Sequence, residues 1–198
     1  MSRFLESIQL KAGEFKRLPF HQARVDYVMK TYFPNQSGIN LTEILSKSSF
    51  PNVGLYKCRI VFDAEIQLLE FSAYKMRNIK SLKLVETDLE SMPFKSEDRE
   101  KLNEAFSKRE NCDDVILIKN GLLTDTSYAN IGLYDGENWI TPRTPLVYGV
   151  NRAELIEKKK IIEKDIRVSD LKDYSKIRLF NAMIEFGALE LGVEDITC

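Results

Sequence analysis

A possible anion-binding site lies in the stretch Asp113–Arg152, which contains most of the sequence's turn signals and whose short β-rich runs lead to a helix. Val115–Lys119 ends in Asn120-Gly121, a strong two-residue hairpin signal, and a later run ends in Asp135-Gly136. Gly149-Val150-Asn151 then opens a segment with helical spacing. Because the N–H groups at a helix start are unpaired and the helix dipole is positive there, this end could bind an anion. The arrangement is common and does not identify a site by itself.

Cysteine and histidine usage limits the other chemistries. The three cysteines, Cys58, Cys112 and Cys198, are an odd number without paired spacing. They indicate reduced thiols in a cytoplasmic protein, and neither a disulfide framework nor a zinc site. His21 is the single histidine, so we expect no histidine-based metal centre and no Ser-His-Asp triad.

The composition is typical of a soluble globular protein. Of 198 residues, 43% are hydrophobic and 30% are charged, and the length suits one large domain or two small ones. The net charge is −1 and the basic residues are mixed with acids, so we expect no nucleic-acid partner. Since no apolar run approaches the ~20 residues that span a bilayer, and the start MSRFLESIQL carries charges, we expect neither a membrane span nor an export signal.

Residues 1–80 predict a small α+β domain with the element order ββααββ. Alternating apolar residues and turn signals predict strands at Phe4–Leu10, Glu14–Leu18, Tyr56–Phe62 and Ile66–Tyr74. Helices are predicted at 20–33, after Pro19, and at Asn40–Ser46, capped by Asn40 or Thr42. The charged connector Lys75–Lys80 marks the expected domain boundary.

Residues 81–198 predict a second domain, so the expected fold class is mixed α/β (α+β) with two domains. It begins with a strand at Leu82–Glu86 and a helix from Ser96 to about Arg109, with Ser96 as its N-cap. The hairpins and the helix after Gly149 follow. The remaining expected elements are strands at Ile166–Val168 and Ile177–Asn181 and a closing segment at Ile184–Leu191.

Three segments, in this order, resemble a known family. They are H-x-x-R at His21 and Arg24, the lysine of FKSEDREKL (Lys95), and L-T-D-T-S-Y-A-N-I (Leu123–Ile131), followed by T-P and L-x-x-G-V-N-R (Leu146–Arg152). Together they resemble the class IV aminotransferases: branched-chain aminotransferases, D-amino acid aminotransferases and aminodeoxychorismate lyases. The resemblance covers Phe4 to about Met183. It implies a fold similar to D-amino acid aminotransferase, with pyridoxal 5'-phosphate (PLP) in the cleft between a small α+β domain and a C-terminal mixed-sheet, partial-barrel domain.

The chain departs from the family pattern in three places. Family members are usually much longer, so the N-terminal domain is abbreviated here. The family's glutamate between the hairpins is Asp125, and Asn151 stands where many members have threonine.

The resemblance assigns the covalent and electronic roles to two residues. PLP needs a lysine that holds its aldehyde and then moves protons at the substrate carbon, and Lys95 is the candidate. A carboxylate must face the pyridine nitrogen to keep it protonated, and Asp125 is placed to do so. The alternatives are a solvated lysine and a turn aspartate that caps local N–H groups.

The PLP phosphate is a dianion, and the resemblance places it on the N–H groups of Val150 and Asn151, with Arg24 as charge partner. Asn181 resembles a family position that adds a side-chain hydrogen bond to the phosphate, although an asparagine at a strand end could equally bind local backbone. His21 is interpreted as structural, packing under the helix and orienting Arg24.

The implied reaction is that of an aminodeoxychorismate lyase, which forms p-aminobenzoate and pyruvate. The short N-terminal domain and Asn181-Ala182-Met183 favour this branch. The alternative is an aminotransferase for branched-chain or D-amino acids with 2-oxoglutarate, in which Arg59 would bind the small-molecule substrate's carboxylate. A shortened relative that only binds, without catalysis, is the alternative from another class. The resemblance also implies a homodimer in which a loop of each subunit completes the other's cleft.

Overall fold

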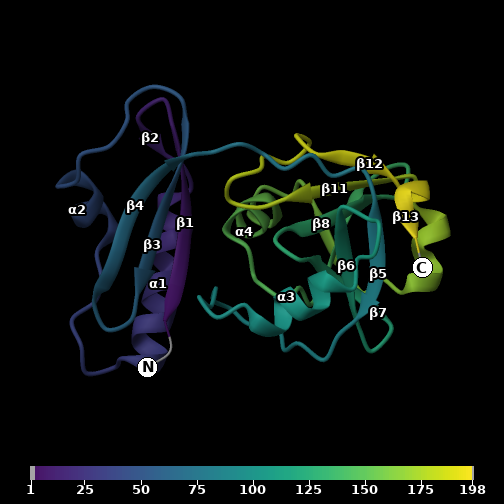
Figure 1. Ribbon diagram of the computed structural model, residues 1–198, viewed down its shortest axis with the longest axis horizontal. Helices are drawn as coiled ribbons and strands as arrows, with labels where there is room; N and C mark the ends of the chain where they lie inside the picture. The colour runs from purple at the N-terminus through teal and green to yellow at the C-terminus, as the bar shows by residue number, and fades with distance from the viewer. Residues whose placement is uncertain (1–2, 198) are drawn as a thin grey trace. The chain divides into compact units, whose positions relative to one another are not determined.

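The computed structural model describes residues 3–197 and confirms the expected mixed α/β class, with two sheets and few helices. The chain divides into two compact units (Figure 1). Unit 1 comprises the described residues up to Met76 together with Pro93–Asp98. Unit 2 comprises Arg77–Met92 together with the described residues from Arg99 onward. The division near residue 80 was expected, but Pro93–Asp98, which includes Lys95, groups with the first unit rather than with 81–198.

Unit 1 is an antiparallel sheet in the order β2-β1-β3-β4, and Figure 1 shows α1 lying along it. Its core joins apolar residues of the sheet, such as Ile8 and Ile60, to Val25 and Val28 of α1. Asn40 caps α2 by accepting the N–H of Glu43 at 3.0 Å. The elements of unit 1 are β1 (Phe4–Lys11), β2 (Glu14–Phe15), α1 (Leu18–Tyr32), α2 (Leu41–Ser46), β3 (Leu55–Phe62) and β4 (Ile66–Ala73).

The segment Pro93–Asp98 belongs to unit 1 because it pairs with β1. Leu5 N–H donates to the carbonyl of Lys95 at 2.8 Å, and Glu97 N–H donates to the carbonyl of Arg3 at 3.0 Å. β2 pairs only with the far end of β1, so the segment covers backbone groups that an edge strand would otherwise expose.

This pairing also explains why Ser96 is not a helix cap. Ser96 forms an antiparallel bridge with Phe4, and its hydroxyl accepts the N–H of Asp98 at 3.1 Å. The helix begins later, as α3 (Glu100–Ser107), with Arg99 at the N-cap position and no side-chain cap. The predicted start at Ser96 was therefore wrong, since the run S-E-D that suits a helix start lies in extended backbone here.

Unit 2 contains a nine-stranded mixed sheet whose main path runs β10-β9-β8-β7-β6-β5-β13, with β11 paired to β8 and β12. The pairs β5–β6, β5–β13 and β9–β10 are parallel and the others are antiparallel. Its strands are β5 (Leu82–Glu86), β6 (Asp114–Lys119), β7 (Leu122–Thr126), β8 (Asn130–Tyr134), β9 (Trp139–Pro142), β10 (Ile162–Lys164), β11 (Lys176–Phe180), β12 (Glu190–Gly192) and β13 (Ile196–Thr197). Its helices are α3, α4 (Val150–Glu157) and the 3-10 turns η1 (Val168–Asp173) and η2 (Val193–Asp195).

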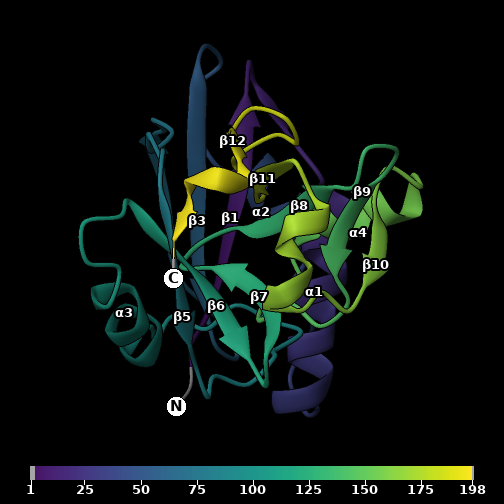
Figure 2. The same ribbon diagram turned by 90° about the vertical axis from the view of Figure 1, so that its right-hand side faces the viewer.

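The helices of unit 2 pack on different parts of its sheet. Ala105 of α3 packs with Val85 and Val115 of β5 and β6, and Figure 2 shows α4 beside β9 and β10. Arg152, buried on α4, joins these elements by donating to the carbonyl of Pro142 at 2.8 Å and to Glu163 at 2.6 Å.

The strand predicted at Ile166–Val168 was wrong. The strand of this region is β10, and Val168 already begins η1. Leu122 and Arg167 form only an isolated antiparallel bridge, in which the Ile166 carbonyl accepts the Leu123 N–H at 2.8 Å and the Val168 N–H donates to the Gly121 carbonyl at 3.4 Å.

Within residues 3–197, no helix is long and apolar enough to cross a membrane, and no cluster of three or more His, Cys, Asp or Glu side chains could hold a metal ion. Cys58 is a buried free thiol and Cys112 a half-buried one. Cys198 lies outside the described residues.

Candidate active site

The best-defined feature of unit 2 is a buried carboxylate at the end of β7. Asp125 is 4% exposed. Its Oδ1 accepts from the side-chain amide of Asn130 at 2.8 Å, and its Oδ2 accepts the N–H of Val147 at 2.9 Å. The same Asn130 nitrogen donates to the carbonyl of Val147 at 2.9 Å. β7 and β8 thus hold the segment that leads to α4.

Burial controls the charge of Asp125. Desolvation raises its pKa to about 6, although the Val147 N–H, Asn130 and the charge of Arg152 each oppose this shift. Each carboxylate oxygen can accept two hydrogen bonds, so these partners leave acceptor capacity. Asp125 is therefore anionic at neutral pH and suited to a cationic or N–H partner.

The N-terminus of α4 follows directly from this segment. Its N-cap, Gly149, has no side chain to cap the helix, and the first intrahelical bond runs from Ala153 N–H to the Gly149 carbonyl at 2.9 Å. The N–H groups of Val150 and Asn151 precede that bond, as expected for an anion-binding helix start.

The side chains of Asn151 and Asn181 are committed to backbone. Asn151 Nδ2 donates to the carbonyls of Asn181 at 2.9 Å and Ile184 at 3.0 Å, so its contribution to an anion would come from its backbone N–H. Its Oδ1 is buried without a hydrogen-bond partner among the described residues. Asn181 donates to the carbonyl of Tyr128 at 3.1 Å and accepts the N–H of Met183 at 2.8 Å.

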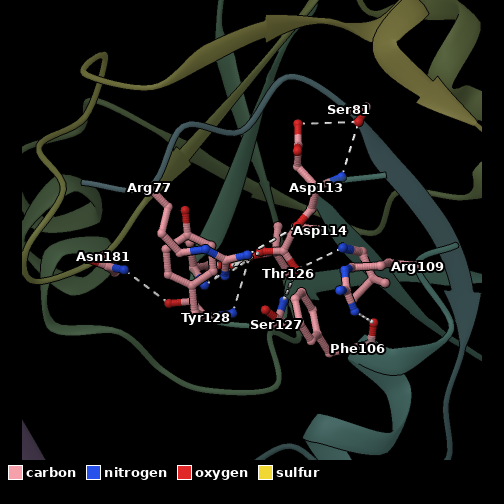
Figure 3. Close-up of polar contacts among 12 residues, drawn as sticks. Arg77, Ser81, Phe106, Arg109, Asp113, Asp114, Thr126, Ser127, Tyr128 and Asn181 are labelled. Atoms are coloured by element: carbon pink, nitrogen blue, oxygen red, sulfur yellow. Dashed lines mark hydrogen bonds and ion pairs between the residues drawn. The ribbon is translucent and has the colours of Figure 1, made fainter. Parts of the chain in front are cut away.

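The turn between β7 and β8, which contains Ser127 and Tyr128, is also held by Asp114 (Figure 3). Asp114 is fully buried, and its Oδ1 accepts the N–H of Ser127 at 3.4 Å. Arg77 lies 3.5 Å from Asp114 Oδ2 and stacks over the ring of Tyr128, with its guanidinium carbon 4.8 Å from the ring centroid. Arg99 donates to the Ser127 carbonyl at 2.8 Å. These contacts fix the backbone between Asp125 and Asn130.

In unit 1, backbone pairing positions Lys95 beside β1. The half-buried side chain extends on the same face as Ser7, and Nζ lies 3.2 Å from Ser7 Oγ. Ser7 is the cross-strand partner of Arg59 on β3, so Lys95 and Arg59 project from neighbouring positions of one sheet face.

Arg59 is already paired with acids. Its guanidinium donates to Glu97 at 2.9 Å and lies 3.5 Å from Glu70. A substrate carboxylate at this position would have to replace one of these partners.

Arg24 and His21 meet at Glu6 of β1, a residue that sequence reasoning did not assign. Arg24 donates from Nε and Nη2 to the two Glu6 oxygens at 2.6 and 2.7 Å, and His21 Nδ1 lies 2.5 Å from Glu6 Oε2. His21 is fully buried, as a structural role requires, and its ring nitrogen contacts Glu6, which in turn holds Arg24. The alternation Phe4, Glu6, Ile8 could have signalled an inward-facing acid.

The structure thus joins the predicted residues within each unit. In unit 2, Asp125 is bonded to Val147, three residues before Val150, and the Asn151 side chain is bonded to the carbonyl of Asn181. In unit 1, Lys95 and Arg59 share a sheet face. Asn130, whose side chain donates to both Asp125 and the Val147 carbonyl, lies in the Leu123–Ile131 motif but was given no predicted role.

Residues 75–189 match the family model for amino-transferase class IV. The chain belongs to the class IV aminotransferase family. Enzymes of this family depend on PLP. The match begins after β4 and includes Lys95, Asp125 and the start of α4.

Proteins of similar length resemble the whole chain. A Haemophilus somnus structure, provisionally described as a 4-amino-4-deoxychorismate lyase, is 32% identical with a TM-score of 0.87, covering 93% of this chain and 98% of that one. A Mesorhizobium loti structure, provisionally described as an amino-acid aminotransferase, has 21% identity and a TM-score of 0.81, covering 96% and 99%, and shows the fold alone. An uncharacterised Haemophilus influenzae protein is 29% identical over 186 residues, 92% of this chain and 98% of that protein.

The residues present fit PLP. Asp125 offers an anionic acceptor in a buried setting, which suits a protonated ring nitrogen. The start of α4 offers N–H donors, which suit a phosphate. Lys95 supplies a primary amine on backbone fixed by β1.

Proposed function

We propose that this chain is a PLP-dependent enzyme of the aminodeoxychorismate lyase type, which forms p-aminobenzoate and pyruvate. The observation that carries PLP binding is the pair of bonds by which Asn130 ties the Asp125 carboxylate to the backbone carbonyl of Val147, three residues before α4 begins. A protein free of PLP chemistry would have no need of the lysine, the carboxylate and the anion-binding helix start together.

PLP, when bound, withdraws electrons from the bonds at the substrate's α-carbon. In this proposal Asp125 keeps the proton on the ring nitrogen, and the N–H groups of Val150 and Asn151 bind the phosphate. Arg24 balances the phosphate charge. Lys95 holds the aldehyde and then moves a proton at the substrate carbon.

The lyase assignment is supported by the similarity to the Haemophilus somnus protein over nearly the full length of both chains. A lyase acts on one substrate, whereas an aminotransferase must accommodate two carboxylate substrates in turn. The double pairing of Arg59 with Glu97 and Glu70 favours the lyase, because a cation held by two acids is less available to a substrate carboxylate.

The second candidate is an aminotransferase, supported by the fold shared with the Mesorhizobium loti protein and by the position of Arg59 beside Lys95. A catalytically inactive relative of the same fold, acting as a binding or structural protein, is the alternative from another class. Following the family resemblance, we also propose a homodimer, which sedimentation equilibrium of the purified protein would test.

The deciding experiment has two steps. Visible absorbance after adding PLP, removed by borohydride with covalent labelling of a lysine, is expected for any PLP enzyme of this family. If neither the absorbance nor the labelled lysine is found, the PLP-enzyme proposal fails and the binding-protein alternative stands. Aminodeoxychorismate is then supplied, and p-aminobenzoate and pyruvate are measured. Branched-chain and D-amino acids with 2-oxoglutarate are assayed in parallel. If the protein transfers amino groups to 2-oxoglutarate but releases no pyruvate from aminodeoxychorismate, the lyase assignment is replaced by the aminotransferase assignment.

A further inference from the structure

Glu6 is an ionised carboxylate inside the apolar core of unit 1. It lies on β1 between Phe4 and Ile8, whose side chains point to the same face and pack against α1, and it is only 1% exposed. A buried carboxylate is costly unless it is paired and hydrogen-bonded. The cost of burying the Glu6 carboxylate must therefore be offset by the residues that bind it.

Those partners both come from α1. His21 and Arg24 are three residues apart on the helix and so project from one face. Arg24 forms a fork with both Glu6 oxygens at 2.6 and 2.7 Å, and its side chain is 9% exposed. Burial alone would raise the pKa of Glu6, but the Arg24 charge and the bonds from His21 and Arg24 hold it at about 2.

The fork determines how Arg24 presents its other donors. Bonds from Nε and Nη2 to one carboxylate lock the guanidinium plane. The opposite edge, formed by Nη1 and the second Nη2 hydrogen, then points away from Glu6. An arginine edge with two parallel donors matches the geometry of a phosphate.

Glu6 also orders His21. Burial lowers the pKa of His21, which favours the neutral ring. The Glu6 carboxylate can only accept, so the neutral ring must carry its hydrogen on Nδ1. The same carboxylate therefore fixes the plane of Arg24 and the tautomer of the adjacent histidine.

We propose that Glu6 is a positioning residue for phosphate binding: by holding Arg24 in one orientation, it makes this arginine a phosphate receptor. This inference rests on the proposed role of Arg24 in binding the PLP phosphate. It makes a prediction that runs against simple electrostatics. Removing a negative charge next to Arg24 should tighten phosphate binding if charge alone mattered, but should weaken it if orientation matters.

The test compares Glu6→Gln with Glu43→Gln, a control at an exposed, ion-paired glutamate of the same unit. We expect PLP to bind about tenfold more weakly to Glu6→Gln, by analogy with the loss of metal affinity when a residue that orients a metal ligand is removed. The control should bind PLP as the unaltered protein does. Equal or tighter PLP binding by Glu6→Gln would overturn the inference.

Two further readouts separate positioning from general damage. Pyridoxal, which has no phosphate, should bind equally to Glu6→Gln and to the unaltered protein, since the effect acts through the phosphate. In an Arg24→Gln background, Glu6→Gln should cause no further loss of PLP affinity. Equal weakening for pyridoxal and PLP, or additive losses in the double variant, would make Glu6 merely structural.

If Glu6→Gln does not fold, Glu6→Asp keeps the charge and withdraws the carboxylate by one methylene. It should also bind PLP more weakly with unchanged pyridoxal binding, and an unchanged PLP affinity would overturn the inference. Absence of PLP binding by the unaltered protein would refute the proposed function and this inference with it. If the unaltered protein binds PLP tightly and the Glu6 variants bind it equally well, only this inference is refuted and the proposed function stands.

Discussion

Asn130 reaches Asp125 across the β7–β8 turn and donates to its carboxylate at 2.8 Å, with both side chains buried. Because the same nitrogen also donates to the Val147 carbonyl, the Asn130 amide cannot flip without losing both bonds. Its oxygen is consequently fixed on the side that faces Gly149. The geometry of the candidate cofactor site thus depends on how closely Asn130 and Gly149 approach each other.

Gly149→Ala tests this approach. A Cβ at residue 149 would lie 2.1 Å from Asn130 Oδ1, so the backbone or the Asn130 amide would have to move. We expect a loss of about 1–3 kcal/mol in the free energy of unfolding, as for other overpacked sites, measured by urea denaturation. Gly38→Ala is the control, since a Cβ there would meet nothing within 4 Å. Equal stability of the two variants would show that Asn130 is not held as described.

The raised pKa of Asp125 predicts opposite effects of pH on folding and on cofactor binding. Burial raises it from 3.8 to about 6, so the folded state binds this proton more tightly than the unfolded state does. Asp125 therefore contributes stability that is fully present below about pH 4 and is lost as pH rises through 6, by roughly 3 kcal/mol in all. Comparing the unfolding free energy of the unaltered protein with that of Asp125→Asn across this range isolates the effect.

PLP should shift this transition. A protonated ring nitrogen near Asp125 favours the carboxylate, so PLP should lower the pH at which Asp125 titrates and should bind more weakly below pH 6. Asp125→Asn should keep the covalent attachment to lysine but lose most turnover, and Asp125→Glu should retain activity. Full turnover by the Asn variant would leave Asp125 as a turn residue only.

Local patterns were sufficient to predict much of this fold. β5 has the predicted bounds because its apolar run is short and bounded by polar residues, and Asn120-Gly121 lies between β6 and β7 as the predicted hairpin turn. The segment around Lys95 was not predicted, since its pairing partner β1 is about ninety residues away and its S-E-D run imitates a helix start. Glu6 was missed for a related reason: a lone acid in a strand indicates solvent unless its partners are known, and these lie on the following helix.

Glu6 should govern the acid stability of unit 1. Its pKa is lowered from 4.5 to about 2, so its ion pairs stabilise the fold above pH 4.5, and this stability is lost as pH falls toward 2. The linked free energy is roughly 3 kcal/mol. In the unaltered protein the unfolding free energy should fall over this range, whereas Glu6→Gln should show a flatter profile from a lower starting value. Parallel profiles for the two proteins would contradict the pairing.

Lys95 is the residue whose assignment most directly links this structure to its proposed chemistry. Its backbone carbonyl accepts the Leu5 N–H, a bond that does not need the side chain, and its Nζ donates to Ser7 Oγ at 3.2 Å. Lys95→Ala should therefore remain folded, with a melting temperature close to that of the unaltered protein, yet lose the borohydride-fixed pyridoxyl group and the activity. Lys101→Ala, at an exposed lysine of α3, should keep both. Peptide mapping by mass spectrometry gives the answer, and a pyridoxyl group on any lysine other than Lys95 would refute the assignment.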